Sequence, residues 1–272
     1  MRNKPKKRKP VMDIVILTGG RFDMLEKCLV AIKEVSALDK VPVHTIVIDN
    51  GTPRPLREKY EHLFDGVTSK RLYNPVGFAE GCNKGASLGK SSLILFLNDD
   101  VVVLPGFFKS MVKRIKSPKV GIVGAKLLFP LDSMDANRPA GAIQHVGITT
   151  RITGAVYHLF VGWSADNPRA QIEGDVWAVT GAALLVHRGL FHKAGGFDPM
   201  YGLGTWEDVD LCMASHAMGY KVQLEPKAVA YHYTGATSTS LNRPFPVQRN
   251  MQMFYDKWKD KGVVEWNEWR YL

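Results

Sequence analysis

Two adjacent carboxylates interrupt one of the most apolar stretches of the chain. The run "LILFL", residues 93–97, ends at Asn98, Asp99 and Asp100 before apolar residues resume. Neighbouring carboxylates repel each other, and each is costly to remove from water. At the end of a core strand, such a pair suggests a cation, a polar ligand or a solvated turn.

A second pair of acids, Glu207 and Asp208, follows the glycine-rich segment "GGFDPMYGLGTW". The residues after the pair have the apolar spacing of a helix, for which Thr205 would be the N-cap. Asp208, three residues later, could then return the hydrogen bond of a capping box. The helix dipole also favours carboxylates in a first turn. The pair is therefore explained either by a helix start or by catalysis.

Single histidines and cysteines are weaker indications of function than the two acid pairs. His232, in "AYHYTG", follows an apolar run, where a lone histidine is usually structural, and His145, in "IQHVG", is a candidate pocket residue. The other histidines have no supporting motif. Cys28, Cys82 and Cys212 are far apart and form no CxxC pair. Neither a disulfide framework nor a zinc site is expected, and a reducing compartment fits best.

The composition indicates a globular chain with a basic beginning. Its 272 residues, 45% of them hydrophobic, can bury the core of one large α/β domain or of two merged subdomains. The formal net charge is +10, and six of the basic residues fall within "RNKPKKRKP", residues 2–10. We expect a disordered solubilising arm there. A phosphate-rich partner, either nucleic acid or an anionic membrane surface, is the alternative.

No apolar run of the sequence approaches the roughly 18 residues of a membrane-spanning helix, and no signal-type segment follows the basic start. The sequence therefore predicts a soluble cytoplasmic protein, with peripheral contact to a membrane as the open alternative. It makes no prediction about the oligomeric state.

The elements that must position these residues alternate regularly in the first half. From residue 11 to about 128, short runs rich in Val, Ile and Leu alternate with amphipathic segments of helical spacing. This pattern is typical of right-handed βαβ units and of a mostly parallel sheet covered on both faces. Ligands of such sheets bind at the carboxyl ends of the strands. Polar turns follow the predicted strands at residues 18–21, 49–51, 74–77 and 98–100.

The glycines do not form a known phosphate-binding loop. No GxGxxG follows the first predicted strand, and Gly85 and Gly89 are separated by three residues where a Walker loop requires four. The sequence therefore argues against a dinucleotide-binding protein and against a P-loop NTPase.

Five segments of the chain, taken in order, match a known family. They are "VIDNGT", "NPVGFAEGCNKG", "LFLNDDV", "VTGAALLVHRGLFHKAGGFDPMYGLGTWEDVDLC" and "AVAYHYTGATS". Through them the chain resembles the inverting family 2 glycosyltransferases of the GT-A fold, particularly the bacterial subgroup of rhamnosyltransferases and galactofuranosyltransferases. The resemblance covers about residues 13–238.

The resemblance implies an α/β protein with a Rossmann-like, mostly parallel central sheet flanked by helices and with a merged acceptor-binding subdomain. The expected segments are a disordered basic tail (1–10), a nucleotide-sugar-binding half (11–128), an acceptor-binding and catalytic half (129–239) and a C-terminal helical tail or lid (240–272). In the last segment, packing of the aromatic residues on the core is favoured over a membrane-surface contact.

In the family, a strand-end acid motif meets the diphosphate of the donor, usually through a divalent cation. Here that motif is Asn98, Asp99 and Asp100, with Asn98 in place of the first acid. The resemblance implies that Asp100 and His232 bind Mn²⁺ or Mg²⁺, which favour hard oxygen ligands. Asp99 would face the ribose or the phosphates.

Donor binding is assigned to the strand ends by the same resemblance. Asp49 would pair with the imide edge of a uracil or thymine, so the expected donor is a UDP- or dTDP-sugar that carries a hexosyl or deoxyhexosyl group. The implied donor-binding residues are Thr18, Arg21, Asp49, Asn74, Gly77, Asn83, Asn98, Asp99 and Gly181. The identity of the sugar does not follow from them.

For catalysis, the resemblance implies that Asp208 is the general base that removes the proton of the acceptor hydroxyl during attack on the anomeric carbon. Glu207 would hold the acceptor or its loop. Trp206 would either offer a flat apolar face to a sugar or have a core or hinge role. The expected acceptor is a glycan or lipid-linked glycan of polysaccharide biosynthesis.

Two other functions stay open at this point. The same chemistry could act on modified bases in DNA, with the basic arm holding phosphates. Alternatively, the chain could be a non-catalytic module that binds nucleotide-sugars, although the presence of Asp208 and His232 argues against this.

Overall fold

The structure is a computed structural model of the chain. It describes residues 9–59, 61–150, 156–171, 173–233 and 245–261. The expected basic tail therefore lies almost wholly outside the described residues, as does the end of the expected C-terminal tail. Within the described ranges, no helix is both long enough and apolar enough to cross a bilayer.

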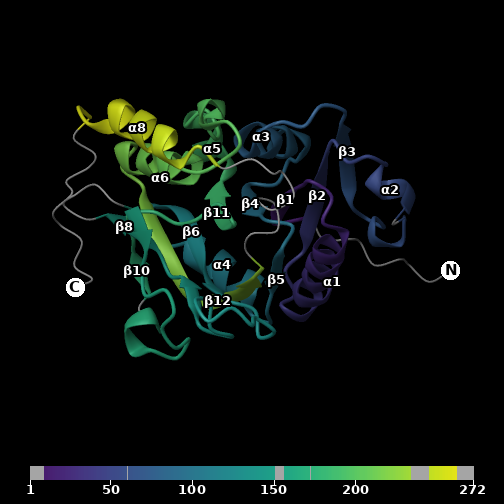
Figure 1. Cartoon of the computed structure of the whole chain (residues 1–272), viewed down its shortest axis with the longest axis horizontal. Helices are drawn as coiled ribbons and strands as arrows, with labels where there is room; N and C mark the ends of the chain where they lie inside the picture. Colours follow the sequence, from purple (N-terminus) through teal and green to yellow (C-terminus); the bar gives the residue numbers. More distant parts are fainter. Residues whose placement is uncertain (1–8, 60, 151–155, 172, 234–244, 262–272) are drawn as a thin grey trace.

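One sheet of ten strands forms the centre of the molecule (Figure 1). Its main path runs β10-β12-β6-β11-β4-β1-β2-β3, while β5 pairs with β12 and β7 pairs with β6. The strands are β1 (Met12–Thr18), β2 (Val43–Asn50), β3 (Thr68–Leu72), β4 (Leu93–Leu97), β5 (Val101–Val103), β6 (Val120–Leu128), β7 (Ile143–His145), β10 (Gly174–Asp175), β11 (Ala183–His187) and β12 (Lys221–His232). A separate two-stranded sheet joins β8 (Ile148–Thr150) to β9 (Val156–His158).

Most strands of the main path point in one direction. β1 pairs in parallel with β2 and β4, β2 with β3, and β6 with β12. β11 runs antiparallel between β4 and β6, so that these two strands share a direction. The predicted α/β class is confirmed. The antiparallel strands β10 and β11 belong to the half of the chain in which the regular sequence alternation ceases.

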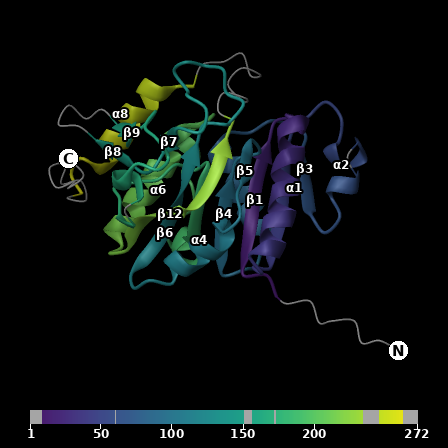
Figure 2. The same ribbon diagram turned by 90° about the horizontal axis from the view of Figure 1, so that it is seen from below.

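Helices cover both faces of the sheet (Figure 1 and Figure 2). On one face lie α1 (Phe22–Leu38) and α4 (Phe107–Ile115). On the other lie α3 (Phe78–Leu88), α5 (Arg188–Lys193), α6 (Glu207–Ala217) and α8 (Val247–Trp258). The short α2 (Leu56–Lys59) lies beyond β3, at the edge of the molecule. Single turns of 3-10 helix occur at Glu61–Leu63, Pro168–Gln171 and Pro199–Tyr201.

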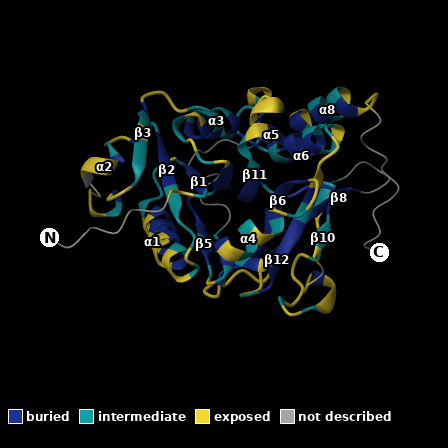
Figure 3. Cartoon of the chain, turned by 180° about the vertical axis from the view of Figure 1, so that it is seen from behind, coloured by how far each residue is buried: buried dark blue, intermediate teal, exposed yellow. Residues whose placement is uncertain are grey.

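Alternate residues of the central strands face opposite cores. In β1, Ile14 and Ile16 belong to the core beneath α1 and α4, whereas Val15 belongs to the core beneath α3, α5 and α6. In β4, Leu95 and Phe96 divide in the same way. Because both faces are covered, these strands carry continuous apolar runs. Figure 3 shows the central strands mostly buried, the strands β3 and β10 at the two ends of the sheet of intermediate burial, and parts of the helices exposed.

The carboxyl ends of the parallel strands meet at one edge of the sheet. Thr18, the last residue of β1, is in register with Asp49 near the end of β2. The turn after β4 is tied to the residue that precedes β11, because the N–H of Asn98 donates to the carbonyl oxygen of Ala182 at 3.0 Å. Polar turns from separate segments of the sequence thus lie next to each other, as expected at a ligand-binding edge.

Candidate active site

A cavity of about 1090 Å³ opens at this edge of the sheet. The predicted site residues on its wall are Gly77, Asn98, Asp99, Asp100, Gly181, Trp206, Glu207, Asp208 and His232. The fold therefore brings together predicted site residues that are up to 155 positions apart in the sequence, from Gly77 to His232.

The turn after β4 presents Asp100 to His232. β5 follows this turn directly and pairs with the end of β12, where Val101 is in register with His232. This register places Nε2 of His232 3.1 Å from Oδ1 of Asp100. The Oδ1 atom is buried and has no aligned hydrogen-bond partner among the described residues. One carboxylate oxygen in this turn is therefore available to a ligand.

Asp99 has different surroundings from its neighbour. It is buried, and it forms a hydrogen bond with the hydroxyl of Thr18 at the end of β1. Burial raises the pKa of Asp99 to about 7, the charge of Asp100 adds to the rise, and Thr18 and Arg21 oppose it. Because two acids are enclosed together here, the turn favours a ligand that brings positive charge or hydrogen-bond donors.

These residues fit a divalent cation held by few protein ligands. Across the described ranges, no group of three or more His, Cys, Asp or Glu side chains is arranged to hold a metal. Asp100 and His232 nevertheless form the kind of pair used by cations that complete their coordination with phosphate oxygens and water. The amide nitrogen of Asn98 lies 3.5 Å from Nε2 of His232, so this residue borders the pair without adding a charge.

The helix that carries the acid pair begins differently from the sequence prediction. α6 begins at Glu207, and its N-cap is Trp206, where the prediction has Thr205. Both Thr205 and Trp206 adopt left-handed backbone conformations, with φ of 78° and 76°. Residues other than glycine rarely do so, and the associated strain is concentrated at functional sites. The predicted Thr205 N-cap is wrong because the backbone turns sharply here before the helix starts.

Asp208 is anchored between two elements. Its Oδ2 accepts a hydrogen bond from the N–H of Gly181 at 2.8 Å, and its Oδ1 accepts one from Val209 at 2.8 Å. Neighbouring Glu207 is 5% exposed, and its Oε2 has no hydrogen-bond partner among the described residues. The start of α6 and the turn before β11 therefore fix the Asp208 carboxylate on the cavity wall, while one oxygen of Glu207 is left without a partner.

Burial raises the pKa of both acids. For Glu207 the rise is large, and the charge of Asp208 adds to it. For Asp208, burial raises the pKa, while the N–H groups of Gly181 and Val209 oppose the rise. When the surroundings of two neighbouring carboxyls differ in this way, the more hydrogen-bonded one is the better ionised base and the other is the better carrier of a proton. The surroundings therefore favour Asp208 as the ionised member of the pair.

The helix α8 holds the loop that precedes the acid pair. Asn250 is fully buried on this helix. Its amide nitrogen lies 2.8, 2.9 and 3.1 Å from the carbonyl oxygens of Tyr201, Gly204 and Thr205. These contacts support the left-handed backbone from the side away from the sheet, and they are a feature that the sequence analysis did not predict.

Trp206 is mostly enclosed by the same helix. It is 8% exposed, and its ring centroid lies 4.9 Å from that of Phe254 and 5.9 Å from that of Tyr255. It borders the cavity, so a small part of the ring can meet a ligand. Most of its surface nevertheless packs on α8.

Asp49 shapes the loop after β2. Its carboxylate accepts hydrogen bonds from the N–H groups of Thr52 at 3.1 Å and Leu56 at 3.3 Å. The two residues that follow it, Asn50 and Gly51, line the cavity. Nε of Arg71 also lies 3.9 Å from its Oδ2. Each carboxylate oxygen has a second lone pair, so the two N–H contacts leave acceptor capacity in Asp49.

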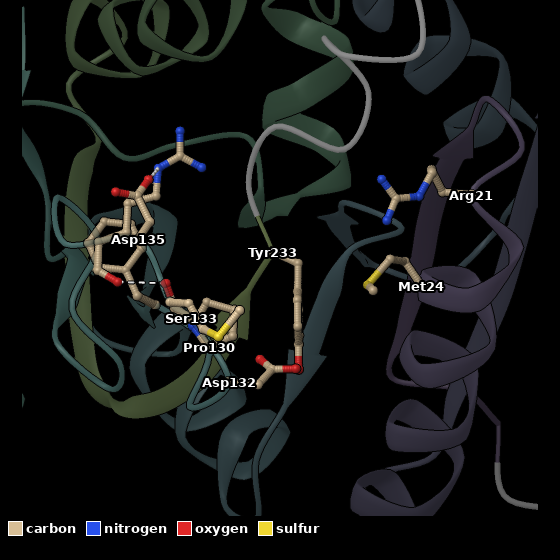
Figure 4. Close-up of a pocket in the computed structure, with 10 residues that line it drawn as sticks. Arg21, Met24, Pro130, Asp132, Ser133, Asp135 and Tyr233 are labelled. Carbon is tan, nitrogen blue, oxygen red and sulfur yellow. Dashed lines mark hydrogen bonds and ion pairs between the residues drawn. The ribbon is translucent and has the colours of Figure 1, made fainter.

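Three predicted donor residues have other surroundings. Asn83 holds the backbone of Phe197, accepting from its N–H at 3.0 Å and donating to its carbonyl oxygen at 2.7 Å. Asn74 lies in an exposed turn. Arg21 borders a second cavity of about 420 Å³, across which it faces Tyr233 (Figure 4). The wall that carries the acid pair thus contains none of these three, and Thr18 and Asp49 are not part of it either.

A pair of histidines beside the cavity was not predicted as a unit. His158 lines the wall, and its Nδ1 lies 2.8 Å from Nδ1 of the buried His145. Nε2 of His145 accepts the N–H of Thr180, in the turn that also holds Asp208. The pair depends on the contact between β8 and β9, for which the sequence carries no periodic signal. The motif "IQHVG" could therefore point to His145 but not to His158.

A family model described as "Glycosyltransferase like family 2" matches residues 21–244 of the chain. The chain is also 25% identical, over 273 residues, to the uncharacterised protein y4gI of Sinorhizobium fredii, covering 96% of this chain and 29% of that protein. It is 27% identical, over 246 residues, to the O-antigen biosynthesis protein RfbC of Myxococcus xanthus, covering 86% and 18% respectively. The chain therefore spans less than a third of the length of either relative.

Solved structures share the fold at low sequence identity. GalNAc-T7, crystallised with UDP, GalNAc and Mn²⁺, superposes with a TM-score of 0.72 at 15% identity, over 92% of this chain and 49% of its own. The mannosyltransferase PcManGT of Pyrobaculum calidifontis, solved with GDP-Man and Mn²⁺, gives 0.59 at 15% identity, over 92% and 71%. Residues 1–349 of S. aureus TarS with UDP-GlcNAc give 0.52 at 13% identity, over 81% and 57%. At these identities the likeness establishes the GT-A-like fold.

Proposed function

The chain belongs to the glycosyltransferase family 2-like proteins, and on this premise we propose that it is an inverting glycosyltransferase with Asp208 as its general base. Its donor is a UDP- or dTDP-sugar, and its acceptor is a hydroxyl of a glycan or lipid-linked glycan. The observation that carries the proposal is that the anchored Asp208 carboxylate and the Asp100–His232 pair line the wall of one cavity.

The position of Asp208 supports general-base chemistry. As the acceptor oxygen bonds to the anomeric carbon, the bond from that carbon to the diphosphate breaks, and its electron pair leaves with the diphosphate. The acceptor proton passes to the Asp208 carboxylate. Attack from the face opposite the diphosphate inverts the configuration of the sugar. The Gly181 N–H keeps the carboxylate in place throughout, and Glu207, the better carrier of a proton, donates a hydrogen bond to the acceptor.

The residues after β4 supply the diphosphate side of the site. Mn²⁺ or Mg²⁺ bound by Asp100 and His232 would neutralise the charge on the departing diphosphate. The amide of Asn98 is a hydrogen-bond donor for the phosphates, and the Asp99 carboxyl faces the ribose or the phosphates.

Gly77 lies where the proposed donor-binding half of the chain contacts the proposed acceptor-binding half. A Cβ atom at this position would overlap the carbonyl oxygen of Gly202, so only glycine allows the start of α3 to approach the loop that leads to the acid pair. We assign residues 11–128 to nucleotide-sugar binding and residues 129–239 to acceptor binding and catalysis.

A pyrimidine donor is favoured by Asp49, whose remaining acceptor capacity suits an imide N–H. The solved neighbours hold UDP, GDP-Man and UDP-GlcNAc, which supports a nucleotide-sugar donor for this chain. The relative named as an O-antigen biosynthesis protein supports a role in polysaccharide biosynthesis. The transfer of a hexosyl or deoxyhexosyl group, as in the rhamnosyltransferase and galactofuranosyltransferase subgroup, is part of the same proposal.

Calorimetric titration with UDP-, dTDP- and GDP-sugars, each with and without Mn²⁺, tests the donor. We expect one pyrimidine nucleotide-sugar to bind in the presence of Mn²⁺ and to be hydrolysed slowly when no acceptor is present. Binding of a GDP-sugar alone would contradict the pyrimidine assignment. Failure of every nucleotide-sugar to bind, under all metal conditions, would contradict the transferase function itself.

A second prediction concerns the support that α8 gives to the acid pair. We expect Asn250→Ala to lower turnover by about 10- to 100-fold, because a displacement of the general base by about 1 Å is enough to cause such a loss. Donor affinity should change much less, since the donor-side turns do not contact Asn250. Sugar transfer or donor hydrolysis gives the first quantity and calorimetry the second.

Gln252→Ala, an exposed change on the same helix, is the control for α8 and should leave both quantities at the wild-type level. If Asn250→Ala weakened donor binding and turnover to the same extent, its effect would be a general loss of folding, and the positioning role of Asn250 would be excluded.

A further inference from the structure

We propose that Gln144 is a positioning residue that selects the tautomer of His232 and thereby prepares its Nε2 atom to bind the divalent cation. The inference rests on the proposed function, because it concerns the metal side of the same site. It adds a residue for which the sequence motifs supply no role.

The end of β6 brings β7 and β12 together near His232. Leu128 of β6 is in register with both Ile143 of β7, which runs antiparallel to β6, and Tyr231 of β12, which runs parallel to it. Gln144 follows Ile143 at a register irregularity between β6 and β7, and His232 follows Tyr231 at the end of β12. Gln144 is 8% exposed, so its amide groups are largely shielded from water and depend on protein partners.

Both polar atoms of the Gln144 amide contact His232. Nε2 donates to the backbone carbonyl oxygen of His232 at 2.9 Å, and Oε1 lies 2.6 Å from the ring Nδ1. The first contact settles the orientation of the amide, because a carbonyl oxygen can only accept and must face the NH₂ group. Oε1 therefore faces the ring. Since an amide oxygen also only accepts, Nδ1 of His232 carries the proton.

A neutral imidazole protonated at Nδ1 has its lone pair at Nε2, to which the amide nitrogen of Asn98 makes only a long contact of 3.5 Å. The Nε2 atom lies 3.1 Å from Oδ1 of Asp100, which itself has no aligned hydrogen-bond partner among the described residues. Two acceptor atoms that approach each other so closely are stabilised by a cation that both can bind. At this separation both atoms would be able to bind the same divalent cation.

The hydrogen bond to the ring can be separated from the hydrogen bond to the backbone. Gln144→Met removes both. Gln144→Glu keeps an acceptor for the Nδ1 proton but loses the donor to the His232 carbonyl oxygen. If Gln144 only tied β7 to β12, both variants would be impaired alike. If it sets the tautomer, Gln144→Glu should retain metal binding, because a carboxylate is a common partner of metal-bound histidine.

The first measurement needs no metal and no change at Gln144. In metal-free wild-type protein labelled with ¹⁵N-histidine, two-bond ¹H–¹⁵N correlation spectra report which ring nitrogen of His232 carries the proton, and His232→Gln assigns the signal. We expect the proton on Nδ1. A proton on Nε2, or a ring protonated on both nitrogens at neutral pH, would overturn the inference.

The second measurement follows Mn²⁺ binding in the presence of UDP by the loss of the electron paramagnetic resonance signal of free Mn²⁺. We expect Gln144→Met to weaken binding by about 10- to 100-fold and Gln144→Glu by no more than about threefold. Gln171→Met is the matched control, because Gln171 also donates to a backbone carbonyl oxygen and accepts from a side chain, away from this site. It should bind Mn²⁺ as the wild type does.

The outcomes separate this inference from the proposed function. Mn²⁺ binding by Gln144→Met within twofold of the wild type would exclude a role for Gln144 in metal binding, while leaving the transferase function intact. If the wild type bound nucleotide-sugars but took up no Mn²⁺, the metal-binding part of both proposals would fail. The tautomer spectrum would still decide whether Gln144 orients His232. Thermal unfolding of each variant shows whether a loss of binding reflects a loss of the fold.

Discussion

Asp208→Asn should lower the rate of sugar transfer by about 10²- to 10⁴-fold, the range expected when a general base is removed. The amide has the same shape as the carboxylate, and its oxygen can still accept the Gly181 N–H that holds Asp208 at 2.8 Å, so that of the two backbone contacts only the one from Val209, in the same turn of α6, is lost. It cannot take up the acceptor proton. Donor affinity and thermal stability should therefore stay close to the wild-type values, and calorimetry and thermal unfolding measure both.

The pH dependence of kcat/KM is a second test of Asp208 as the general base. The base must be ionised to accept a proton, and burial raises the pKa of Asp208 above the usual value of about 3.9 for aspartate. The wild-type kcat/KM should therefore fall as the pH drops through this raised pKa. The residual activity of Asp208→Asn should lack this acidic limb, because the titrating group is gone.

Glu207→Gln separates the roles of the two acids. It should raise the KM for the acceptor more than it lowers kcat, because Glu207 is proposed to hold the acceptor and not to take its proton. If Glu207→Gln lost nearly all turnover while Asp208→Asn kept it within about tenfold of the wild type, the two assignments would be exchanged.

The first half of the fold could be predicted because its signals are local. Strands buried on both faces require continuous apolar runs, and turns at the carboxyl edge require polar or small residues, so β1 and β4 end close to the predicted positions. The antiparallel placement of β11 could not be predicted in this way. It depends on pairing with β4 and β6, which are more than 50 residues away in the chain, and an apolar run carries no information about its partner.

The residues of the candidate site likewise fall into those with a local signal in the sequence and those without one. Asp99 and Asp100 stand out in the sequence because acids at the end of an apolar strand are unusual. Asn250 and Gln144 do not stand out, because their importance comes from backbone carbonyls and a ring nitrogen supplied by distant segments. Thr205 gave a misleading signal for a related reason. Its residue type favours an N-cap, but contacts with Asn250 accompany a left-handed backbone at that position.

Asp100→Ala should weaken Mn²⁺-dependent donor binding by about 10²- to 10³-fold, which corresponds to about 3–4 kcal/mol. The change removes the buried Oδ1 atom that lies 3.1 Å from Nε2 of His232, so that a single protein ligand remains. Donor binding measured without Mn²⁺ should change little, because the contacts at Asp49 are untouched. Calorimetric titrations with and without the metal separate the two contributions.

Asp65→Ala, at an exposed turn, controls for the loss of an acid elsewhere on the chain and should bind the donor as the wild type does. The decisive result is the metal dependence of Asp100→Ala. If donor binding by this variant still strengthened with Mn²⁺ as much as in the wild type, Asp100 would not be a metal ligand. Because Asp99 and Asp100 are each only 4% exposed, a solvated turn would not then explain them, and direct hydrogen bonding of a protonated acid to the donor would be the remaining explanation for carboxylates at the end of β4.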